Sequence, residues 1–340
     1  MSQLTEREKK ILKFVIHDFI ETAHPIGSKF VSKLHRLEES PATIRNTMAN
    51  LECIGLISHP HTSAGRIPTD KGYRYYVDCL MELKKFPKNK QVEIEQQLLS
   101  SQDAEEMLRV SSKILGTISN QLSIVLLPKF SKIILERLEL VSISSSKLMV
   151  VIALQSGFIK TIMIEIRNEI SRSYLHILES FLNERLSGLT LEEIRTTFAD
   201  RVIDMQDEAS GLIRIFINSV DTMFDVVKKE KIYLNGTSSI VSQPEFFNGK
   251  NFRTVVDLLN NEDMFIHVLE IENKNDKSVN VIIGEENKDK RFSEFSIVTS
   301  QYKSGKVNGT IGIIGPKRMN YSKVIPIVKY ISNIVSKILS

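Results

Sequence analysis

The sequence is poor in cysteine, which excludes the folds that depend on it. Only two cysteines, Cys53 and Cys79, occur in 340 residues. Cysteine alone therefore supplies neither a disulfide framework nor a four-ligand zinc site. We interpret both as reduced structural thiols, with a redox switch at Cys53 as the alternative.

Long hydrophobic runs and a strong net charge are also missing. The longest apolar run, Leu148 to Leu154, is too short to cross a bilayer, and the N-terminal residues MSQLTEREKK lack the apolar core of a secretory signal. We therefore expect a cytoplasmic protein with no membrane partner. The formal charge of +4 is too small for a general polyanion binder, so contact with nucleic acid depends on local placement of Lys and Arg. A hydrophobic content of 42% supplies cores for two or three domains.

Patterns typical of catalysis or metal binding are absent from the sequence. Gly309, Gly312 and Gly315 have a G-x-x-G-x-x-G spacing, which differs from the dinucleotide fingerprint and from the phosphate loop. Glu285 and Glu286 are adjacent, so their side chains diverge on a regular element. His176 and His267 are far apart in the sequence, and neither has a neighbouring His or Cys to complete a metal site. We expect no enzyme and no cofactor.

The N-terminal region has the order of a helix-turn-helix. Thr5 and Glu8 form a capping box before apolar residues at helical spacing. Pro25 and Gly27 interrupt that pattern, and Ser28 is the expected N-cap of a short second helix. A further helix after a tight turn would complete the motif.

The third helix presents an unusual polar surface. We expect Ser40 as its N-cap, Pro41 as its first residue and Gly55 just beyond its end. At about 100° per residue, one face carries the apolar side chains of Ile44, Met48 and Leu51. The residues opposite or flanking that face are Ala42, Thr43, Arg45, Asn46, Ala49 and Asn50. This outer surface is short and carries no acidic group.

A two-stranded wing is expected after this helix. Leu56-Ile57 and Arg66-Ile67 flank a loop that contains Pro, Ser and Gly. Thr69 or Asp70 then caps another helix. Such a wing can place Arg66 against the DNA backbone while the preceding helix occupies the major groove. DNA binding is the favoured interpretation, and a protein-interaction module is the alternative.

Beyond Phe86 the composition indicates a linker and then an α+β region. The charged stretch KKFPKNKQVEIEQQ is typical of a linker that leads into a helix. A helical pattern from Asp103 ends near Pro128, and strand-like runs follow at 138–143, 148–154 and 160–166. Helical segments return between 171 and 227, before mixed strands and a final helix.

Several segments resemble one known family. The winged-helix domain of the HrcA heat-inducible transcription repressors is similar to SPATIRNTMANLECIGLISHPHTSAGRIPTDKGYRYYV, which begins at Ser40. Further signature segments of that family resemble GTSSIVSQPEF, VNVIIGEEN and GTIGIIGPKRMNYSKVIPIV, in the same order. Because distinct motifs agree along nearly the whole chain, this resemblance is more specific than a helix-turn-helix alone.

The resemblance implies a dimeric repressor of chaperone operons that binds an inverted-repeat operator in double-stranded DNA. It also implies that the chaperonin GroEL helps to keep the repressor active. The implied α+β fold is a winged helix followed by a GAF-like domain that an inserted dimerisation domain interrupts. We therefore expect a winged-helix domain at 1–86, a linker at 87–102, a split GAF-like domain at 103–170 and 280–340, and an inserted dimerisation domain at 171–279.

Carried over residue by residue, the resemblance places DNA contacts on the third helix and the wing. The expected positions are Ser40, Thr43, Arg45, Asn46, Asn50, Thr62, Ser63, Arg66 and Lys71. Arg can bond guanine, Asn can bond adenine, and Ser40 with the helix N-terminus can hold a phosphate. For Arg45, pairing with Glu52 or with a phosphate is an alternative to base contact.

Two further expectations concern the rest of the chain. Residues 1–85 carry 13 Lys and Arg against 10 Asp and Glu, so one module offers few phosphate contacts. We therefore expect two modules held at a fixed separation by the helices between 171 and 227. A one-component sensor of a small molecule is the alternative function, because a GAF-like fold often holds a ligand.

Overall fold

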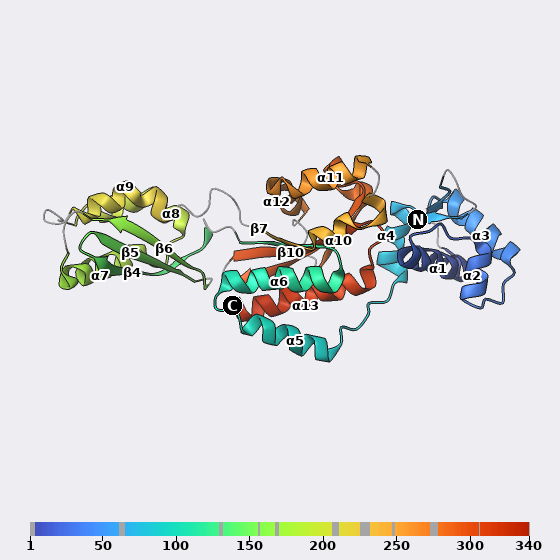
Figure 1. The fold of residues 1–340 in the computed structure, drawn as a ribbon, viewed down its shortest axis with the longest axis horizontal. Helices are drawn as coiled ribbons and strands as arrows, with labels where there is room; N and C mark the ends of the chain where they lie inside the picture. Colours follow the sequence, from blue (N-terminus) through green and yellow to red (C-terminus); the bar gives the residue numbers. More distant parts are fainter. Residues whose placement is uncertain are drawn as a thin grey trace.

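The computed structural model describes residues 4–60, 65–128, 132–155, 157–166, 170–205, 211–224, 232–246, 249–272, 278–305 and 307–339. These residues form three units in a row, with the N-terminal unit at one end and a small sheet unit at the other (Figure 1). The predicted α+β class is confirmed, because helices and antiparallel sheets are both present.

The N-terminal unit is the predicted winged helix. Its elements are α1 (Glu6–Thr22), α2 (Ser28–Leu34), α3 (Pro41–Cys53), β1 (Ile57–Ser58), β2 (Ile67–Pro68), α4 (Asp70–Tyr75) and the π-helical turn η1 (Tyr76–Leu80). The predicted capping box of α1 is confirmed, since Thr5 Oγ1 accepts from Glu8 N at 3.3 Å and Glu8 Oε2 accepts from Thr5 N at 2.9 Å. The predicted cap of α2 is wrong: Gly27 precedes the helix, and Ser28 is a buried residue of its first turn.

The central unit is an antiparallel sheet between two layers of helices (Figure 1). Its described strands are β3 (Leu122–Leu126), β7 (Ile232–Asn235), β8 (Asn280–Ile283), β9 (Phe295–Ser304) and β10 (Val307–Pro316), in the spatial order β7-β3-β10-β9-β8. One face is covered by α6 (Ala104–Ser119) and α13 (Tyr321–Leu339), with α5 (Lys88–Leu99) outside them. The other face is covered by α10 (Thr237–Val241), the turn η3 (Pro244–Phe246), α11 (Gly249–Leu259) and α12 (Glu262–Glu272). Two short turns, η4 (Gly284–Glu286) and η5 (Lys290–Phe292), lie between β8 and β9.

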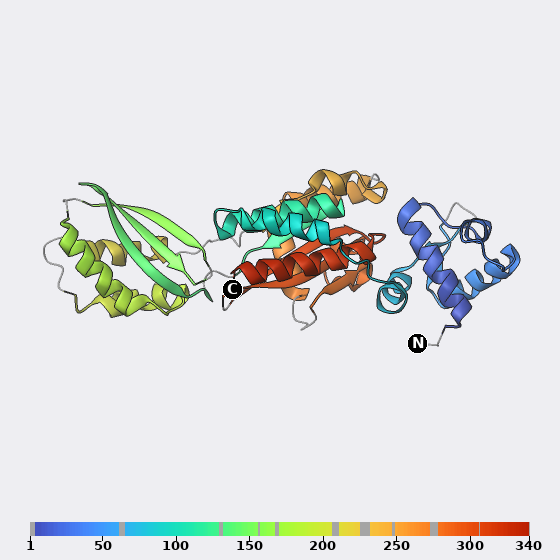
Figure 2. The same cartoon turned by 90° about the horizontal axis from the view of Figure 1, so that it is seen from below.

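The third unit is formed by the chain between β3 and β7. It contains β4 (Leu135–Ser144), β5 (Lys147–Leu154), β6 (Ile159–Glu165), α7 (Arg172–Leu186), α8 (Leu191–Val202) and α9 (Leu212–Phe224). The strands pair antiparallel in the order β4-β5-β6, and Figure 2 shows the helices gathered on one side of them. Alternate residues of β5, beginning with Leu148, are buried, so the residues between them point to the opposite face.

The sheet pairing differs from the domain division expected from the sequence. The sequence places β4, β5 and β6 in the split GAF-like domain, but they pair with one another and with no other described strand. It places β7 in the insertion at 171–279, but β7 pairs with β3 in the central sheet. β3 itself is not among the predicted strands. Its residues are all buried, and they follow α6 closely after the left-handed Asn120. In the sequence, this apolar run therefore reads as a continuation of the apolar pattern of the helix.

A glycine in β10 makes room for a buried tyrosine. Gly309 is the partner of Tyr302 in the register of β9 and β10. The fully buried Tyr302 donates its hydroxyl to the Leu126 carbonyl at the end of β3, at 3.2 Å. A Cβ on Gly309 would lie 2.3 Å from the tyrosine ring. Gly309 therefore serves close packing and the alignment of three strands.

We expect Gly309→Val to lower the free energy of unfolding by about 1–3 kcal/mol, because the added side chain overpacks β9 and β10. Urea denaturation followed by circular dichroism measures this change. The control is Gly27→Ala, whose added Cβ would meet no atom within 4 Å. That variant should lose less than about 1 kcal/mol, and equal losses for the two would contradict the packing role.

Candidate nucleic-acid interface

Helix α3 begins and ends as its sequence requires. The Ser40 side chain accepts a hydrogen bond from Thr43 N at 3.2 Å, and Pro41 follows as the first helical residue. The last turn closes at Ile54, and Gly55 then takes the left-handed conformation with φ 76°. The predicted limits of this helix are confirmed.

The apolar face of α3 is buried in the winged helix, and the polar face is exposed. Ile44, Met48 and Leu51 are at most 3% exposed. Four of the predicted contact residues are exposed on the other side: Ser40, Arg45, Asn46 and Asn50. Thr43 is half-buried, and its carbonyl accepts from Thr47 Oγ1 at 3.1 Å. The helix thus offers one guanidinium, two amides and a hydroxyl to solvent on a surface without a carboxylate.

The acidic residue near the end of α3 is occupied by the wing. Glu52 Oε2 lies 3.0 Å from Arg66 Nε, and Glu52 Oε1 contacts His59 Nδ1. Because Glu52 faces these two groups, the alternative in which it pairs with Arg45 is not what the structure shows. The Glu52 charge is offset locally, so it does not oppose an approaching phosphate in full.

The wing residues differ from one another in how they are placed. The Arg66 side chain is only 14% exposed, and its backbone forms a bridge with Ile26 in which both hydrogen bonds measure 2.8 Å. Lys71 is exposed and donates to the Ile54 carbonyl at 2.8 Å, which closes the end of α3. Thr62 and Ser63 lie outside the described residues. Arg66 of the wing and Lys71 of α4 therefore both contact the C-terminal end of α3 as well as carrying charge.

A buried carboxylate fixes α2 against α1, which sequence analysis did not identify. The Asp18 side chain is 2% exposed and accepts from His35 Nε2 at 2.9 Å. The His35 ring stacks on Phe14 with ring centres 3.7 Å apart, and His17 Nδ1 lies 3.4 Å from Asp18 Oδ1. Asp18 lies on the apolar stripe of α1 at a position that periodicity assigns to a hydrophobic residue. A charged residue there is the one sequence signal of this contact.

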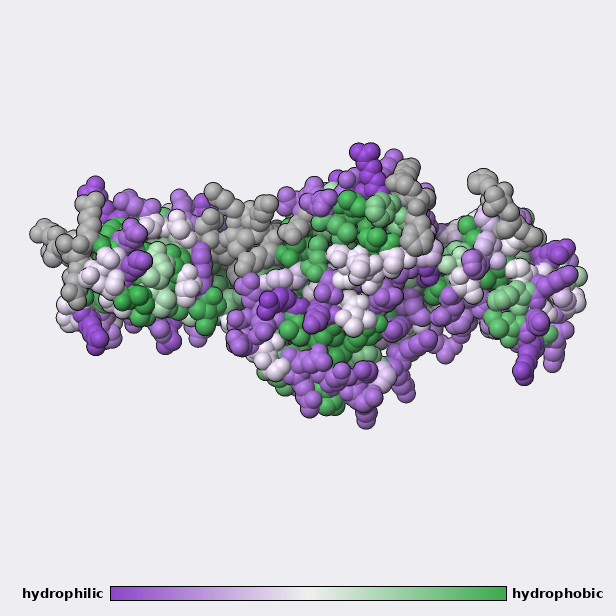
Figure 3. Space-filling model, viewed as in Figure 1, coloured by the Kyte–Doolittle hydropathy of each residue, from purple (hydrophilic) through white to green (hydrophobic). Residues whose placement is uncertain are grey.

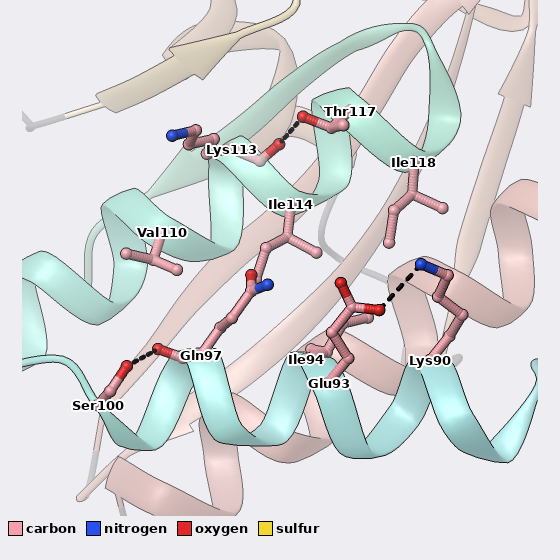
Figure 4. Close-up of a pocket in the computed structure, with 10 residues that line it drawn as sticks. All are labelled: Lys90, Glu93, Ile94, Gln97, Ser100, Val110, Lys113, Ile114, Thr117 and Ile118. Atoms are coloured by element: carbon pink, nitrogen blue, oxygen red, sulfur yellow. Dashed lines mark hydrogen bonds and ion pairs between the residues drawn. The ribbon is translucent and has the colours of Figure 1, made fainter.

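A hollow in the described surface lies elsewhere, between α5 and α6. Its volume is about 530 Å³, and its apolar lining residues are Ile94, Val110, Ile114 and Ile118 (Figure 4). Figure 3 shows apolar surface on this side of the central unit. Several of the polar side chains that line it are bonded within their own helix, whereas the Gln97 side chain points into the space between the two helices (Figure 4). These bonds are Lys90 to Glu93 at 2.9 Å, Ser100 Oγ to the Gln97 carbonyl at 2.9 Å, and Thr117 Oγ1 to the Lys113 carbonyl at 2.8 Å (Figure 4). The groove thus gives no specific support to the small-molecule sensor.

Two family models match this chain. The model described as the HrcA protein C-terminal domain matches residues 105–325. The model described as the winged helix-turn-helix transcription repressor HrcA, DNA-binding, matches residues 3–78. The chain belongs to the HrcA family. The resemblance inferred from the sequence motifs is thereby confirmed.

Curated members of the HrcA family match over nearly the full chain. The heat-inducible transcription repressor HrcA of Prosthecochloris aestuarii is 38% identical over 348 residues, which cover 99% of this chain and 98% of the relative. The protein of that name from Chlorobaculum parvum is 42% identical over 360 residues, with the same shares covered. A crystal structure described as that of a hypothetical protein has a TM-score of 0.69 at 23% identity and 98% coverage of both chains, which supports the fold.

The HrcA relatives are named as transcription repressors and not as enzymes, in agreement with the absence of catalytic patterns from the sequence. Within the described ranges, no cluster of three His, Cys, Asp or Glu side chains is arranged to hold a metal ion. The helices among these residues are too short or too polar to cross a membrane. The exposed face of α3 is therefore the candidate site of this HrcA-family chain.

We expect Asp18→Ala to lower the free energy of unfolding of the winged helix by about 3 kcal/mol, because it leaves His35 without its buried partner. Thermal unfolding and amide hydrogen exchange of α1 and α2 measure the effect. Glu38→Ala, at an exposed site, is the control and should stay within about 0.5 kcal/mol. A double-mutant cycle with His35→Ala should show a coupling above about 1 kcal/mol; additive losses would mean that the two side chains act independently.

Proposed function

We propose that this chain is a heat-inducible transcription repressor that binds operator DNA with α3 in the major groove. The observation that carries the proposal is the exposed face of α3, which offers Arg45, Asn46 and Asn50 without a carboxylate beside them. Groups of this kind suit the edges of base pairs, because Arg matches guanine and Asn matches adenine. Membership of a repressor family with a DNA-binding winged helix supports the same function. We place its action in the cytoplasm, where a bacterial operator is found.

Phosphate contacts are proposed for the two ends of α3. The N-terminus of this helix, with Ser40, suits an anionic oxygen because its backbone N–H groups and its dipole point outward there. Lys71, Thr62 and Ser63 are proposed to contact the phosphate backbone of the DNA near the other end of the helix. Arg66 is proposed to contribute through its ion pair with Glu52, which holds the wing against the end of α3. Thr43, half-buried beside Ser40, is proposed to meet a thymine methyl.

Asn46→Ala should weaken operator binding by about 1–3 kcal/mol and leave binding to random duplex DNA nearly unchanged, because the amide reads a base edge. The operator is first obtained by selection from random duplexes with the full-length protein, and an inverted repeat is the expected product. Titrations at two salt concentrations then compare the variant with Asn89→Ala, a control at an exposed position on α5. If Asn46→Ala weakens both DNAs equally, the side chain contacts phosphate instead.

We propose that the chain is a homodimer and that the outer face of the β4-β5-β6 sheet forms its interface. Val141, Met149 and Met163 follow one another across the three strands. Val141 is 37% exposed and Met163 is 52% exposed, and Ile159 at the start of β6 is 68% exposed. An apolar strip of this kind on a sheet face is typical of a surface that another protein covers. The sequence analysis expected the helices between 171 and 227 to hold the two copies together. The present proposal assigns the dimer contact to the sheet instead, because these helices bury its other face.

Met163→Lys should raise the dimer dissociation constant at least about 10-fold, because two like charges would be desolvated near the centre of a symmetric contact. Sedimentation equilibrium measures the constant, and circular dichroism checks the fold. The control is Ile203→Lys, which changes a side chain that is 80% exposed beyond the end of α8. The interface is misplaced if Ile203→Lys dissociates the dimer and Met163→Lys does not.

From the family resemblance we also propose that GroEL keeps the repressor active and that heat acts through loss of active protein. The long apolar face of the small sheet would be a chaperonin target before dimerisation, since chaperonins hold chains with exposed apolar surface. Repression of a reporter template reconstituted with and without chaperonin at elevated temperature is the test. Full repression without chaperonin at that temperature would contradict this mechanism.

A further inference from the structure

We propose that a charged socket on the central unit fixes the orientation of the winged helix and thereby selects the spacing between operator half-sites. The socket consists of residues 243–245, 281–286 and 317–322, three segments far apart in sequence. Arg318 of the socket and Arg74 of the winged helix, which contacts the socket, act as positioning residues for DNA recognition. This inference rests on the proposed function as a dimeric operator-binding protein.

Arg318 joins the winged helix to two segments of the central unit. Its Nη1 donates to the Ile20 carbonyl in the last turn of α1 at 3.2 Å. Its Nη2 donates to Gln243 Oε1 at 2.9 Å, and its Nε contacts the Glu245 carboxylate. The side chain is 15% exposed. A guanidinium at the carboxyl end of α1 also opposes the negative end of the helix dipole, so Arg318 favours the docked position of that helix.

A second set of contacts holds α4. Arg74 Nε donates to Glu286 Oε1 at 2.8 Å, and Arg74 Nη2 donates to the Val281 carbonyl at 2.6 Å. The hydrogen bond that Arg74 donates to the Glu286 carboxylate raises the pKa of the Arg74 guanidinium, which burial by itself would lower. Asp70 Oδ2 accepts from Glu285 N at 2.9 Å, and Asp70 Oδ1 lies 3.1 Å from Lys317 Nζ. Positive and negative groups therefore face one another across the contact between the winged helix and the socket. This arrangement favours one relative position of the two.

Buried rings and backbone contacts fill the centre of the same joint. Tyr73 and Tyr321 are at most 2% exposed, and their ring centres lie 6.2 Å apart. Burial raises the pKa of both hydroxyls, so both rings remain neutral. Lys84 N, in the connection to α5, donates to the Ser322 carbonyl at 3.0 Å. Gly284 has φ +56°, and a Cβ there would lie 2.0 Å from the Asp70 carboxylate, so its backbone admits the Asp70 contact.

The docked winged helix keeps its DNA face free. The socket contacts the end of α1, α4 and the connection after η1, and none of these contacts involves the outer face of α3. Figure 1 shows α4 beside the central unit and α3 on the far side of the winged helix. Docking is therefore compatible with DNA binding and fixes the direction in which α3 points.

Fixed docking and loose tethering predict different responses to operator spacing. Residues 81–87, between η1 and α5, have no helix or strand and would reach about 25 Å if released. A domain on such a tether would follow a half-site that is moved along or around the duplex. Inserting five base pairs turns one half-site by about half a helical turn, which a rigid dimer cannot follow without losing a contact.

The experiment compares the selected operator with the same operator carrying five inserted base pairs between its half-sites. For the full-length protein we expect affinity for the inserted operator to fall at least about 100-fold, to the level of a single half-site. Arg74→Met and Arg318→Met should bind the selected operator at least about 10-fold more weakly and should reduce the ratio between the two operators to about 3-fold or less. Arg195→Met is the control, because Arg195 pairs with Asp221 within the small sheet unit at 2.6 Å.

A charge swap separates positioning from simple loss of fold. Arg74→Glu alone should remove spacing selectivity, and Arg74→Glu combined with Glu286→Arg should restore at least part of it, while sedimentation shows dimers throughout. An unchanged operator ratio in Arg74→Met and Arg318→Met, an equal change in Arg195→Met, or no recovery in the swap would overturn the proposal. If the unmodified protein does not distinguish its selected operator from random DNA, the proposed function fails instead, so the two failures are distinguishable.

Discussion

The pairing of β3 with β10 is the interaction on which the arrangement of this chain depends. β3 has only five residues, but it lies between β7 and β10 and carries α6 on its N-terminal side. Because β3 and β7 are neighbours, the chain leaves the sheet after Leu126 and returns at Ile232 beside the strand that it left. The small sheet unit can therefore be inserted without disturbing the central ladder. Tyr302, which reaches across Gly309 to the Leu126 carbonyl, ties this exit point to β9.

The same sheet also places the winged helix. β10 ends at Pro316, and the next residues, Lys317 and Arg318, contact α4 and the end of α1. α13 then begins at Tyr321, which packs against Tyr73. The position of the winged helix is thus a consequence of where the central strand of the sheet ends. A shift in the register of β10 would move the charged groups away from their partners in the winged helix.

Local signals made α3 predictable, and long-range pairing made the domain division unpredictable. Ser40, Pro41 and Gly55 act within their own turn, so the sequence defines α3 and its exposed face. The partner of β3 lies near residue 312, and no local pattern distinguishes β3 from the apolar strands that form the small sheet. The contacts of Arg66 with Glu52 and Ile26 were likewise not predictable from the sequence, because these residues meet only after folding. The glutamates of IGEEN gave no functional signal for the same reason: their partners, Arg74 and Asp70, lie more than 200 residues earlier.

The shape of the molecule explains why rigid joints would matter for recognition. The apolar face proposed as the dimer contact and the recognition helix lie at opposite ends of the row of units (Figure 1). Any rotation at a joint between them moves α3 by an amount that grows with its distance from that joint. A winged helix with an excess of only three basic residues cannot compensate for a misplaced partner with extra phosphate contacts. Under the proposed function, specific binding by such a molecule depends on geometry more than on charge, and the residues that set the geometry are as important for operator choice as those proposed to touch the bases.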